Sequence, residues 1–448
     1  MYMYVRVALE ICWGDKQEFV SAMQKIERDN LGQKPIPDDL LLDILVCLPA
    51  KSLMRFKIVC KSWHALIRDP RFAESHHAVS RTRRPDSSHV LLYVTTENAP
   101  ALRRWMSIFP VQPRWGIFPV KLDDGILSNH LPVHMFDGAS AYDENKWFHR
   151  AKFISATNIV NGLICLWVEK EYQFELLNLT TKEKVPLPRS ELWLHSRNPC
   201  NPAHYLGFDP IKKQYKVLIR FGEGEYFIIT FSGDKRMSWR KVDGLPQLGI
   251  YRRRENTCVD GAIYWHTYSH VCELPNCEGW EEKNVQYFEV GQEKFNVLPV
   301  HDHVGNEPVD SVFQTEVGGK FTLAFLNRSH SHGTTDQITL WRLINRRDQD
   351  WVRSRIELPS WLLVGRRYLS FSGSTNTGDM LVKISNLYAC DTLIFCDLEE
   401  DKKHATLKLM STDKFSDWIP TPMPTYAAFR HHVENILPLN LLNDMRKG

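Results

Sequence analysis

Long apolar runs are missing from this sequence. No run reaches about 18 residues, so no segment could cross a bilayer as a helix. The first 30 residues are interrupted by Arg6, Glu10 and Asp15, and no cleavage-site pattern follows an apolar run, so a secretory signal is not expected. A formal net charge of +3 requires no polyanionic partner. The short basic runs at 81–84 and 252–254 lack interleaved aromatic residues and are expected to be solvated loops, not a nucleic-acid surface.

Motifs of enzymes are also missing: we find no nucleophile elbow, no phosphate-binding glycine loop and no supported carboxylate pair. The densest group of metal-ligand types is His266, His270, Cys272 and Cys277. Its order and spacing match no common zinc site, because zinc ligands normally come in pairs a few residues apart. We interpret this group as a polar loop, and expect no metal, no cofactor and no catalytic residue.

The ten cysteines are scattered, with Cys60, Cys165 and Cys396 inside apolar runs. Such positions are typical of buried, reduced thiols. We therefore expect an intracellular protein, in the cytoplasm, the nucleus or both.

One segment contains more apolar residues than a small helical fold needs to bury. Between Leu40 and Ile67, 19 of the 28 residues are apolar. A helix that buries one face needs roughly 3 apolar positions in 7, so this segment has a second apolar surface to cover. The cover comes either from a larger domain of the same chain or from a partner protein.

Local signals predict that this segment is helical in three pieces. Pro37 suits a first helical turn, with Asp38 and Asp39 at the positive end of the helix dipole. Pro49 ends that helix, and Ser52 is expected to cap the next. Apolar side chains then recur at helical spacing up to Asp69-Pro70, at Leu53, Phe56, Val59, Cys60, Trp63, Leu66 and Ile67.

The strings IPDDLL, DIL, LPAKSL, RF, VCKSW and LIRDPRF in residues 36–72 resemble the F-box of plant F-box proteins. The F-box is the helical module that docks onto the SKP-type adaptor of a cullin-based ubiquitin ligase. Ile36 and Cys47 depart mildly from the family pattern. The resemblance implies adaptor contacts at Pro37, Leu40, Leu48, Pro49, Leu53, Val59, Cys60 and Trp63. We expect Trp63 to be the main anchor, since large buried aromatics dominate interface hot spots.

From about Ser88 the periodicity becomes strand-like. The runs HVLLYV, QYKVLIRF, YFIITF, NVQYFEV, ITLWRLI and DTLIFCDL are short, rich in β-branched and aromatic residues, and bounded by turn formers. A glycine opens or precedes a strand at Gly162, Gly207, Gly261, Gly319 and Gly378, at intervals of 45, 54, 58 and 59 residues. A unit of about fifty residues suits a four-stranded propeller blade.

Two further repeats agree with this unit. FELLNLTTKEKVPLP and YFEVGQEKFNVLPV both read as strand, polar turn and strand, and MSWRKVDGLP matches QDWVRSRIELP, with Trp239 and Trp351 at equivalent places. The strings NGLICLW, LGFDPIKKQYKVL, VDGAIYW and YFEVGQEKFNVLPV resemble the F-box-associated domain of plant F-box proteins, a relative of kelch propellers. Because only Gly318-Gly319 forms a double glycine, a distorted barrel or a pair of sandwiches remains an alternative.

We therefore predict an α+β multidomain fold, a small helical F-box followed by a large all-β domain that is a β-propeller of six or seven blades. The expected boundaries are 1–34 for an N-terminal extension, 35–80 for the F-box, 88–437 for the propeller and 438–448 for a tail. Met23 is a candidate natural start. Ile58, Leu66 and Phe72 are candidates for packing on the propeller.

Most of the 14 tryptophans and 15 tyrosines are expected in the core. Aromatic residues at strand ends or loops, at Trp193, Tyr205, Trp280 and Trp361, could instead form a recognition face. The long polar segments 192–205, 266–283 and 301–310 are expected to be binding loops.

The expected function is that of a substrate-recognition subunit of an SCF-type ubiquitin ligase, with an SKP-type adaptor, a cullin reached through it, and a client protein as partners. No nucleic acid or membrane is expected as a partner. The alternative is an F-box protein that sequesters or relocates its partner without ubiquitination, and a propeller enzyme or glycan binder ranks third.

Overall fold

The computed structural model describes most of the chain between residues 38 and 439. The described residues are 38–82, 89–95, 114–123, 126–127, 134–137, 154–168, 173–189, 203–221, 225–231, 237–243, 257–266, 284–300, 311–327, 337–357, 368–374, 380–385, 392–396, 407–410, 425–431 and 434–439. In this part of the chain no helix is long and apolar enough to span a membrane.

Four helices form the N-terminal part of the described chain. They are α3 (Asp38–Val46), α4 (Ala50–Phe56), α5 (Lys61–Ile67) and α6 (Pro70–Thr82). The expectation that Ser52 caps the second helix is wrong, because Pro49 takes the N-cap position and Ser52 lies inside α4. The three helical pieces predicted between residues 40 and 67 are confirmed as α3, α4 and α5, and the division between α4 and α5 lies at Cys60, which adopts an extended conformation and starts a new helix. Its sulfur accepts the amide N–H of Trp63 at 3.5 Å.

The β region consists of six antiparallel sheets among the described residues, which we number as blades 1 to 6. Blade 1 holds β25 (Thr425–His431), β1 (His89–Thr95), β2 (Arg114–Asp123) and β3 (Ile126–Leu127), and β4 (His134–Asp137) also pairs with β2. Blade 2 holds β5 (Ile154–Ala156), β6 (Leu163–Val168), β7 (Gln173–Asn178) and β8 (Lys184–Pro186). Blade 3 holds β9 (Ala203–Asp209), β10 (Gln214–Phe221), β11 (Glu225–Phe231) and β12 (Arg240–Val242).

The remaining blades have the same plan. Blade 4 holds β13 (Thr257–Val259), β14 (Ala262–His266), β15 (Asn284–Glu289) and β16 (Lys294–Pro299). Blade 5 holds β17 (Ser311–Val317), β18 (Lys320–Asn327), β19 (Gln337–Asn345) and β20 (Asp350–Glu357). Blade 6 holds β21 (Tyr368–Ser374), β22 (Met380–Ser385), β23 (Thr392–Cys396) and β24 (Leu407–Met410). The predicted all-β domain of blades is confirmed: among the described residues five sheets are four-stranded, and blade 1 has five strands.

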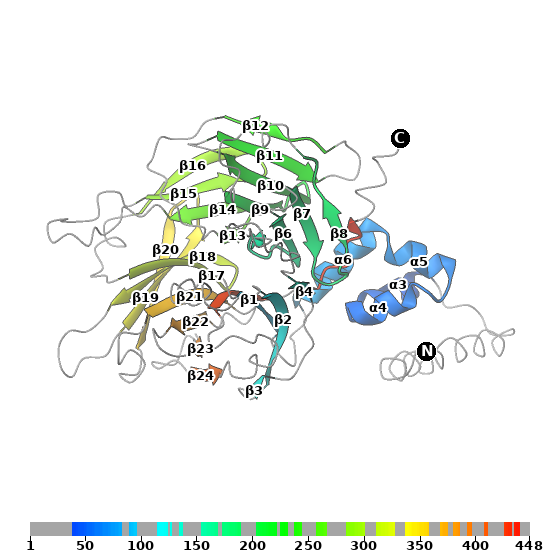
Figure 1. Ribbon diagram of the computed structural model, residues 1–448, viewed down its shortest axis with the longest axis horizontal. Helices are drawn as coiled ribbons and strands as arrows, with labels where there is room; N and C mark the ends of the chain where they lie inside the picture. The colour runs from blue at the N-terminus through cyan, green and yellow to red at the C-terminus, as the bar shows by residue number, and fades with distance from the viewer. Residues whose placement is uncertain are drawn as a thin grey trace, which may run out of the picture.

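The blades follow one another around a propeller-like domain, with the helices gathered at one side (Figure 1). Consecutive inner strands β9, β13, β17, β21 and β25 contact one another. Blade 1 is assembled from both ends of the domain, because the last strand, β25, pairs with the first, β1. Val90 lies opposite His431 in this pairing, so the chain enters and leaves the domain at neighbouring points.

Alternation along the strands builds a core between each described pair of neighbouring blades from blade 2 to blade 5. In β10, Val217 packs into a cluster shared with blade 2, whereas Leu218 packs into a cluster shared with blade 4. In β14, Tyr264 packs with blade 5 and stacks on Phe321 at 4.2 Å between ring centroids. This period of two lets each sheet bury both faces, as radial stacking of blades requires.

The two repeated tryptophans occupy equivalent places, as predicted. Trp351 lies in the outer strand β20 and is buried, and Trp239 directly precedes the outer strand β12 and is half-buried. The indole N–H of Trp239 donates to the carbonyl oxygen of Pro188 at 2.7 Å, which joins blade 3 to blade 2. Tyr205 is also a core residue, because β9 begins at Ala203 and carries it into the interface with blade 4. Its expected place in a recognition loop is therefore wrong.

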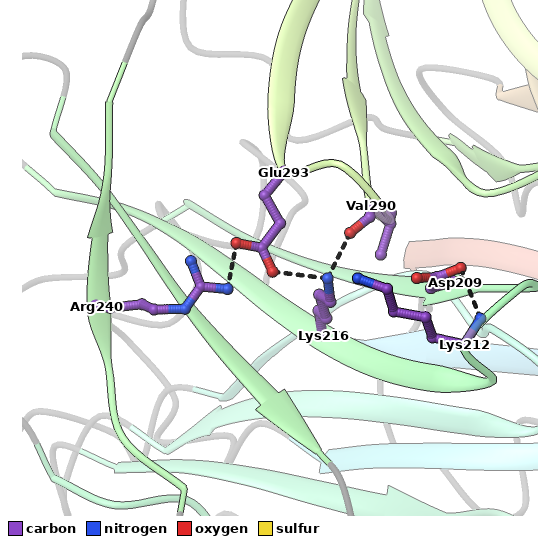
Figure 2. A network of polar contacts seen from close by, with 6 residues as sticks. All are labelled: Asp209, Lys212, Lys216, Arg240, Val290 and Glu293. Carbon is purple, nitrogen blue, oxygen red and sulfur yellow. Dashed lines mark hydrogen bonds and ion pairs between the residues drawn. The ribbon is translucent and has the colours of Figure 1, made fainter.

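A buried ion pair joins blades 3 and 4. Lys216 of β10 faces blade 4 and is almost fully buried. Its Nζ donates to the carbonyl oxygen of Val290 at 2.7 Å and pairs with the Glu293 carboxylate at 2.6 Å (Figure 2). Arg240 pairs with the other carboxylate oxygen. Burial alone would raise the pKa of Glu293, but the hydrogen bonds and charges of Arg240 and Lys216 outweigh it and hold that pKa below its usual value.

Candidate functional site

The helical module has a compact apolar core. Leu45, Leu53, Phe56, Ile67 and Phe72 are buried together between the helices. Ile44, next to Leu45 on α3, is only half-buried. About 45 residues are too few to hold such a core strongly without further contacts.

The residues expected to contact an adaptor lie in three different environments. Pro49 is exposed, whereas Leu48, Val59, Cys60 and Trp63 are half-buried. Leu53 is fully buried in the core, so in this structure it offers no surface to a partner and its substitution would act on the fold. Leu40 lies in α3, but its side chain is outside the described residues, as is the whole of Pro37.

Trp63 is held in place from two sides. Its ring packs edge-on against Phe56 with 5.3 Å between the centroids, and its amide is bonded to Cys60 at the start of α5. These two contacts fix the orientation of the half-buried indole.

Among the described side chains of this module, two large apolar ones are exposed. Ile58, between α4 and α5, is 55% exposed, and Leu42 on α3 is 37% exposed. The expectation that Ile58 packs on the propeller is wrong. Phe72 and Leu66 contribute to the core of the helical module itself. The surplus apolar surface recognised in the sequence is thus partly free in the described molecule, as a partner-binding surface would be.

Part of the apolar surface of the helical module is covered by residues from the C-terminal end of the chain. Residues 434–439, which we call the C-terminal strap, run between the helices and blades 2 and 3. Ile436 is fully buried in the core of the helical module, and Leu439 is fully buried in the cluster between blades 2 and 3. The expected domain boundary at 437 falls inside this strap. Its sequence, ENILPL, carries no periodic signal that could have identified it.

Charged contacts also link the helices to the blades. Glu74 of α6 pairs with Lys213 in the turn between β9 and β10. Lys57 lies near Glu183, in the turn between β7 and β8. Burial lowers the pKa of Lys57, and Glu183 offsets part of that effect. The helical module therefore sits on the end of the blades that carries these turns.

The opposite end of the blades carries the long connections. In a four-stranded antiparallel sheet, the turns after the first and third strands share one end, and the remaining connections share the other. The short turns at 161–162, 210–213, 260–261 and 290–293 define the first end, which we call the turn face. The segments expected to bind a client join strands at the other end, the loop face. Most of their residues, including Trp193 and Trp280, lie outside the described residues, as does Trp361.

Most of the group of His and Cys residues between 266 and 277, interpreted above as a polar loop, lies outside the described residues. His266 ends β14, and His270, Cys272 and Cys277 lie outside the described part of the chain. Among the residues that are described, no group of three or more His, Cys, Asp or Glu side chains could hold a metal ion.

Comparisons with known proteins agree with this architecture. A family model described as the F-box associated beta propeller domain matches residues 118–433, and one described as the F-box domain matches residues 36–75. The chain is similar to F-box protein At1g30790 of Arabidopsis thaliana, with 24% identity over 408 residues, 84% of this chain and 89% of that protein. It is also similar to F-box protein At1g52495 of Arabidopsis thaliana, with 26% identity over 428 residues, 94% of this chain and 90% of that protein.

Proposed function

The chain belongs to the F-box proteins with an F-box associated beta propeller domain, and from this membership we propose that it is a substrate-recognition subunit of an SCF-type ubiquitin ligase. Its F-box binds an SKP-type adaptor and, through it, a cullin, and its propeller binds a client protein. The chain itself is not catalytic. It accelerates transfer by holding the client near the ubiquitin-carrying subunits, an effect of proximity.

The observation that carries the proposal is the exposed apolar surface of the F-box. Ile58 and Leu42 are exposed, and Trp63 is half-buried, in the same small module. Large apolar side chains that remain exposed on a module with a closed core mark a contact surface. Trp63, Val59, Cys60 and Leu48 would surround the contact, and Pro49 would lie at its edge.

The arrangement of the two parts supports the second half of the proposal. The described F-box helices contact the turn face, through Glu74 and the C-terminal strap, so a client would bind at the loop face. Adaptor and client would then bind at opposite ends of the propeller. Because cullin-based ligases act inside the cell, we also propose a location in the cytoplasm, the nucleus or both.

Introduction of a negative charge at an exposed isoleucine tests the adaptor surface. Ile58→Glu should weaken binding of a purified SKP-type adaptor by at least about 30-fold, as expected for a hot spot worth about 2 kcal/mol. Ile211→Glu is the matched control, because Ile211 is 88% exposed but lies on the propeller between β9 and β10. Adaptor binding that survives Ile58→Glu and Trp63→Ala together would rule out this surface.

Client lifetime separates ubiquitination from sequestration. Proximity labelling with the full chain and with an Ile58→Glu chain identifies clients that bind independently of the adaptor. If the protein is a ligase receptor, these clients are degraded more slowly in cells that carry Ile58→Glu. Unchanged lifetimes together with a changed location of the clients would favour the sequestering alternative.

A further inference from the structure

The C-terminal strap contributes to the F-box as its own helices do. Ile436 is 0% exposed and packs in the same cluster as Leu53 and Phe72. The Glu434 carboxylate accepts the amide N–H of Ala50 at 3.0 Å, at the start of α4, where the N-cap residue Pro49 makes no side-chain hydrogen bond. His77 of α6 contacts the carbonyl oxygen of Glu434 at 3.1 Å through Nδ1. The strap thus contacts both the second and the fourth helices of the F-box.

The same six residues are fixed to the turn face of the propeller. The backbone amide of Asn435 donates to the Thr180 hydroxyl at 2.9 Å, and the backbone amide of Leu439 donates to the Glu183 carboxylate at 2.7 Å. Asn178 donates from its side-chain amide to the carbonyl oxygen of Leu437 at 3.1 Å. These bonds place the strap in a defined position on blade 2, so Ile436 is presented to the F-box in one orientation.

Chain topology makes this position depend on closure of the propeller. The strap begins three residues after the end of β25, and β25 is held in blade 1 by pairing with β1. The F-box comes before β1, and the strap follows the last strand of the domain. Ile436 can therefore reach the F-box in this arrangement only when the first and last strands have paired.

We propose that the C-terminal strap is an integral part of the F-box, so that the adaptor-binding surface is complete only in a chain whose propeller has closed. This inference rests on the proposed function for its link to the adaptor. A chain that lacks its last strand, or has not yet closed its ring, would present an F-box without Ile436 and without the Glu434 contact. Such a chain would recruit the adaptor poorly even though residues 36–75 are intact.

Substitution of one buried isoleucine tests the proposal in the full-length protein. Ile436→Ala should weaken binding of an SKP-type adaptor by at least about tenfold, because removal of buried methyl groups from a small core is costly. Ile211→Ala is the matched control, since Ile211 is 88% exposed on the turn face. The adaptor affinity of the Ile211→Ala variant should stay within about twofold of that of the unmodified chain. Truncation after residue 433 should weaken binding at least as much as Ile436→Ala, whereas truncation after residue 440 should not.

Hydrogen exchange supplies a readout that does not need the adaptor. Ile436→Ala should speed amide exchange in α3 to α6 and leave exchange in blades 4 and 5 unchanged. The proposal would be overturned if amide exchange in the F-box helices were the same in Ile436→Ala and in the unmodified chain. It would also be overturned if exchange increased by the same factor in the helices and in blades 4 and 5. So would an adaptor affinity that Ile436→Ala leaves unchanged. If the unmodified chain binds no SKP-type adaptor, the proposed function fails, while the exchange experiment still decides whether the strap completes the F-box.

Discussion

Asn435 and Asn161 are joined across 274 residues of sequence: the side-chain amide of Asn435 donates to the backbone carbonyl oxygen of Asn161 at 2.7 Å. The same amide donates to the hydroxyl of Tyr215 at 3.1 Å, so one side chain holds blade 2, blade 3 and the C-terminal strap together. Asn161 adopts a left-handed conformation, with φ of 48°, in the turn before β6. This turn thus connects two strands of blade 2 and also holds the C-terminal strap, which packs against the F-box.

Replacement of Asn435 should destabilise the protein. Asn435→Ala removes two donors at a buried position and leaves the Asn161 carbonyl and the Tyr215 hydroxyl without these bonds. Loss of such a buried partner costs about 2–3 kcal/mol in the free energy of unfolding. Asn296→Ala is the control, because the Asn296 side chain bonds to Lys294 at an exposed place. Urea unfolding of both variants measures the difference, and equal values would contradict the structural role of Asn435.

Two glycines in equivalent turns should differ in their tolerance of a methyl group. Gly261 and Gly319 both have φ of +72°, so alanine is strained at either position. At Gly261 a Cβ would also lie 2.9 Å from the Cδ of Pro210, whereas at Gly319 no atom lies within 4 Å. We expect Gly319→Ala to cost about 1 kcal/mol and Gly261→Ala about 1–3 kcal/mol more. Thermal unfolding checks the order, and a larger loss for Gly319→Ala would contradict it.

The glycine repeat shows how much of the propeller was predictable from sequence. Gly162, Gly261 and Gly319 all occupy the second position of a tight turn at positive φ, the place where glycine is favoured in a two-residue hairpin. Local chemistry fixes these positions, so they recur visibly. Gly207 is a glycine for another reason. It lies inside β9, and because it has no Cβ, blade 4 can approach β9 closely at this point. Gly378 lies outside the described residues.

The candidate site was only partly predictable for a corresponding reason. Periodic helix signals and the family resemblance located the F-box and its half-buried Trp63. Burial of Leu53 and exposure of Ile58 depend on how short helices pack, which spacing along the chain does not determine. The role of Ile436 depends on pairing between strands at opposite ends of the domain, and no local pattern encodes such a contact.

Neutralisation of Glu293 should weaken the junction of blades 3 and 4. Glu293→Gln leaves the buried ammonium group of Lys216 without its carboxylate, and loss of one partner of a buried pair costs about 3 kcal/mol. The pair between Lys241 and Glu225 is the matched control, because both of its side chains are more than half exposed. Glu225→Gln should leave the free energy of unfolding almost unchanged, because water screens an exposed pair. Urea unfolding at neutral pH compares the two, and equal losses would contradict the importance of burial.

Acid should remove the contribution of the Glu293–Lys216 ion pair to the free energy of unfolding. The folded-state pKa of Glu293 lies below its ordinary value of 4.5, so this carboxylate stabilises the fold fully above that value. As the pH falls from 4.5 through the folded pKa, Glu293 takes up a proton and the contribution is lost. The difference in unfolding free energy between the unmodified chain and Glu293→Gln should therefore shrink below pH 4.5. A difference that stays constant from neutral pH into this range would contradict the assignment.

A double-mutant cycle should reveal direct contact between blades 3 and 4 at Gly207. A Cβ at this position would lie 2.6 Å from Cγ2 and 3.3 Å from Cγ1 of Val290, so rotation of the valine cannot relieve both contacts. Gly207→Ala should cost about 1–3 kcal/mol through overpacking. Val290→Ala should itself cost stability by removing buried methyl groups, but it also opens space for the new methyl. The double variant should thus be more stable than the sum of the single effects predicts, by at least about 0.5 kcal/mol. Strictly additive losses would mean that the backbone shifts to absorb the clash and that the two blades are not in rigid contact at this point.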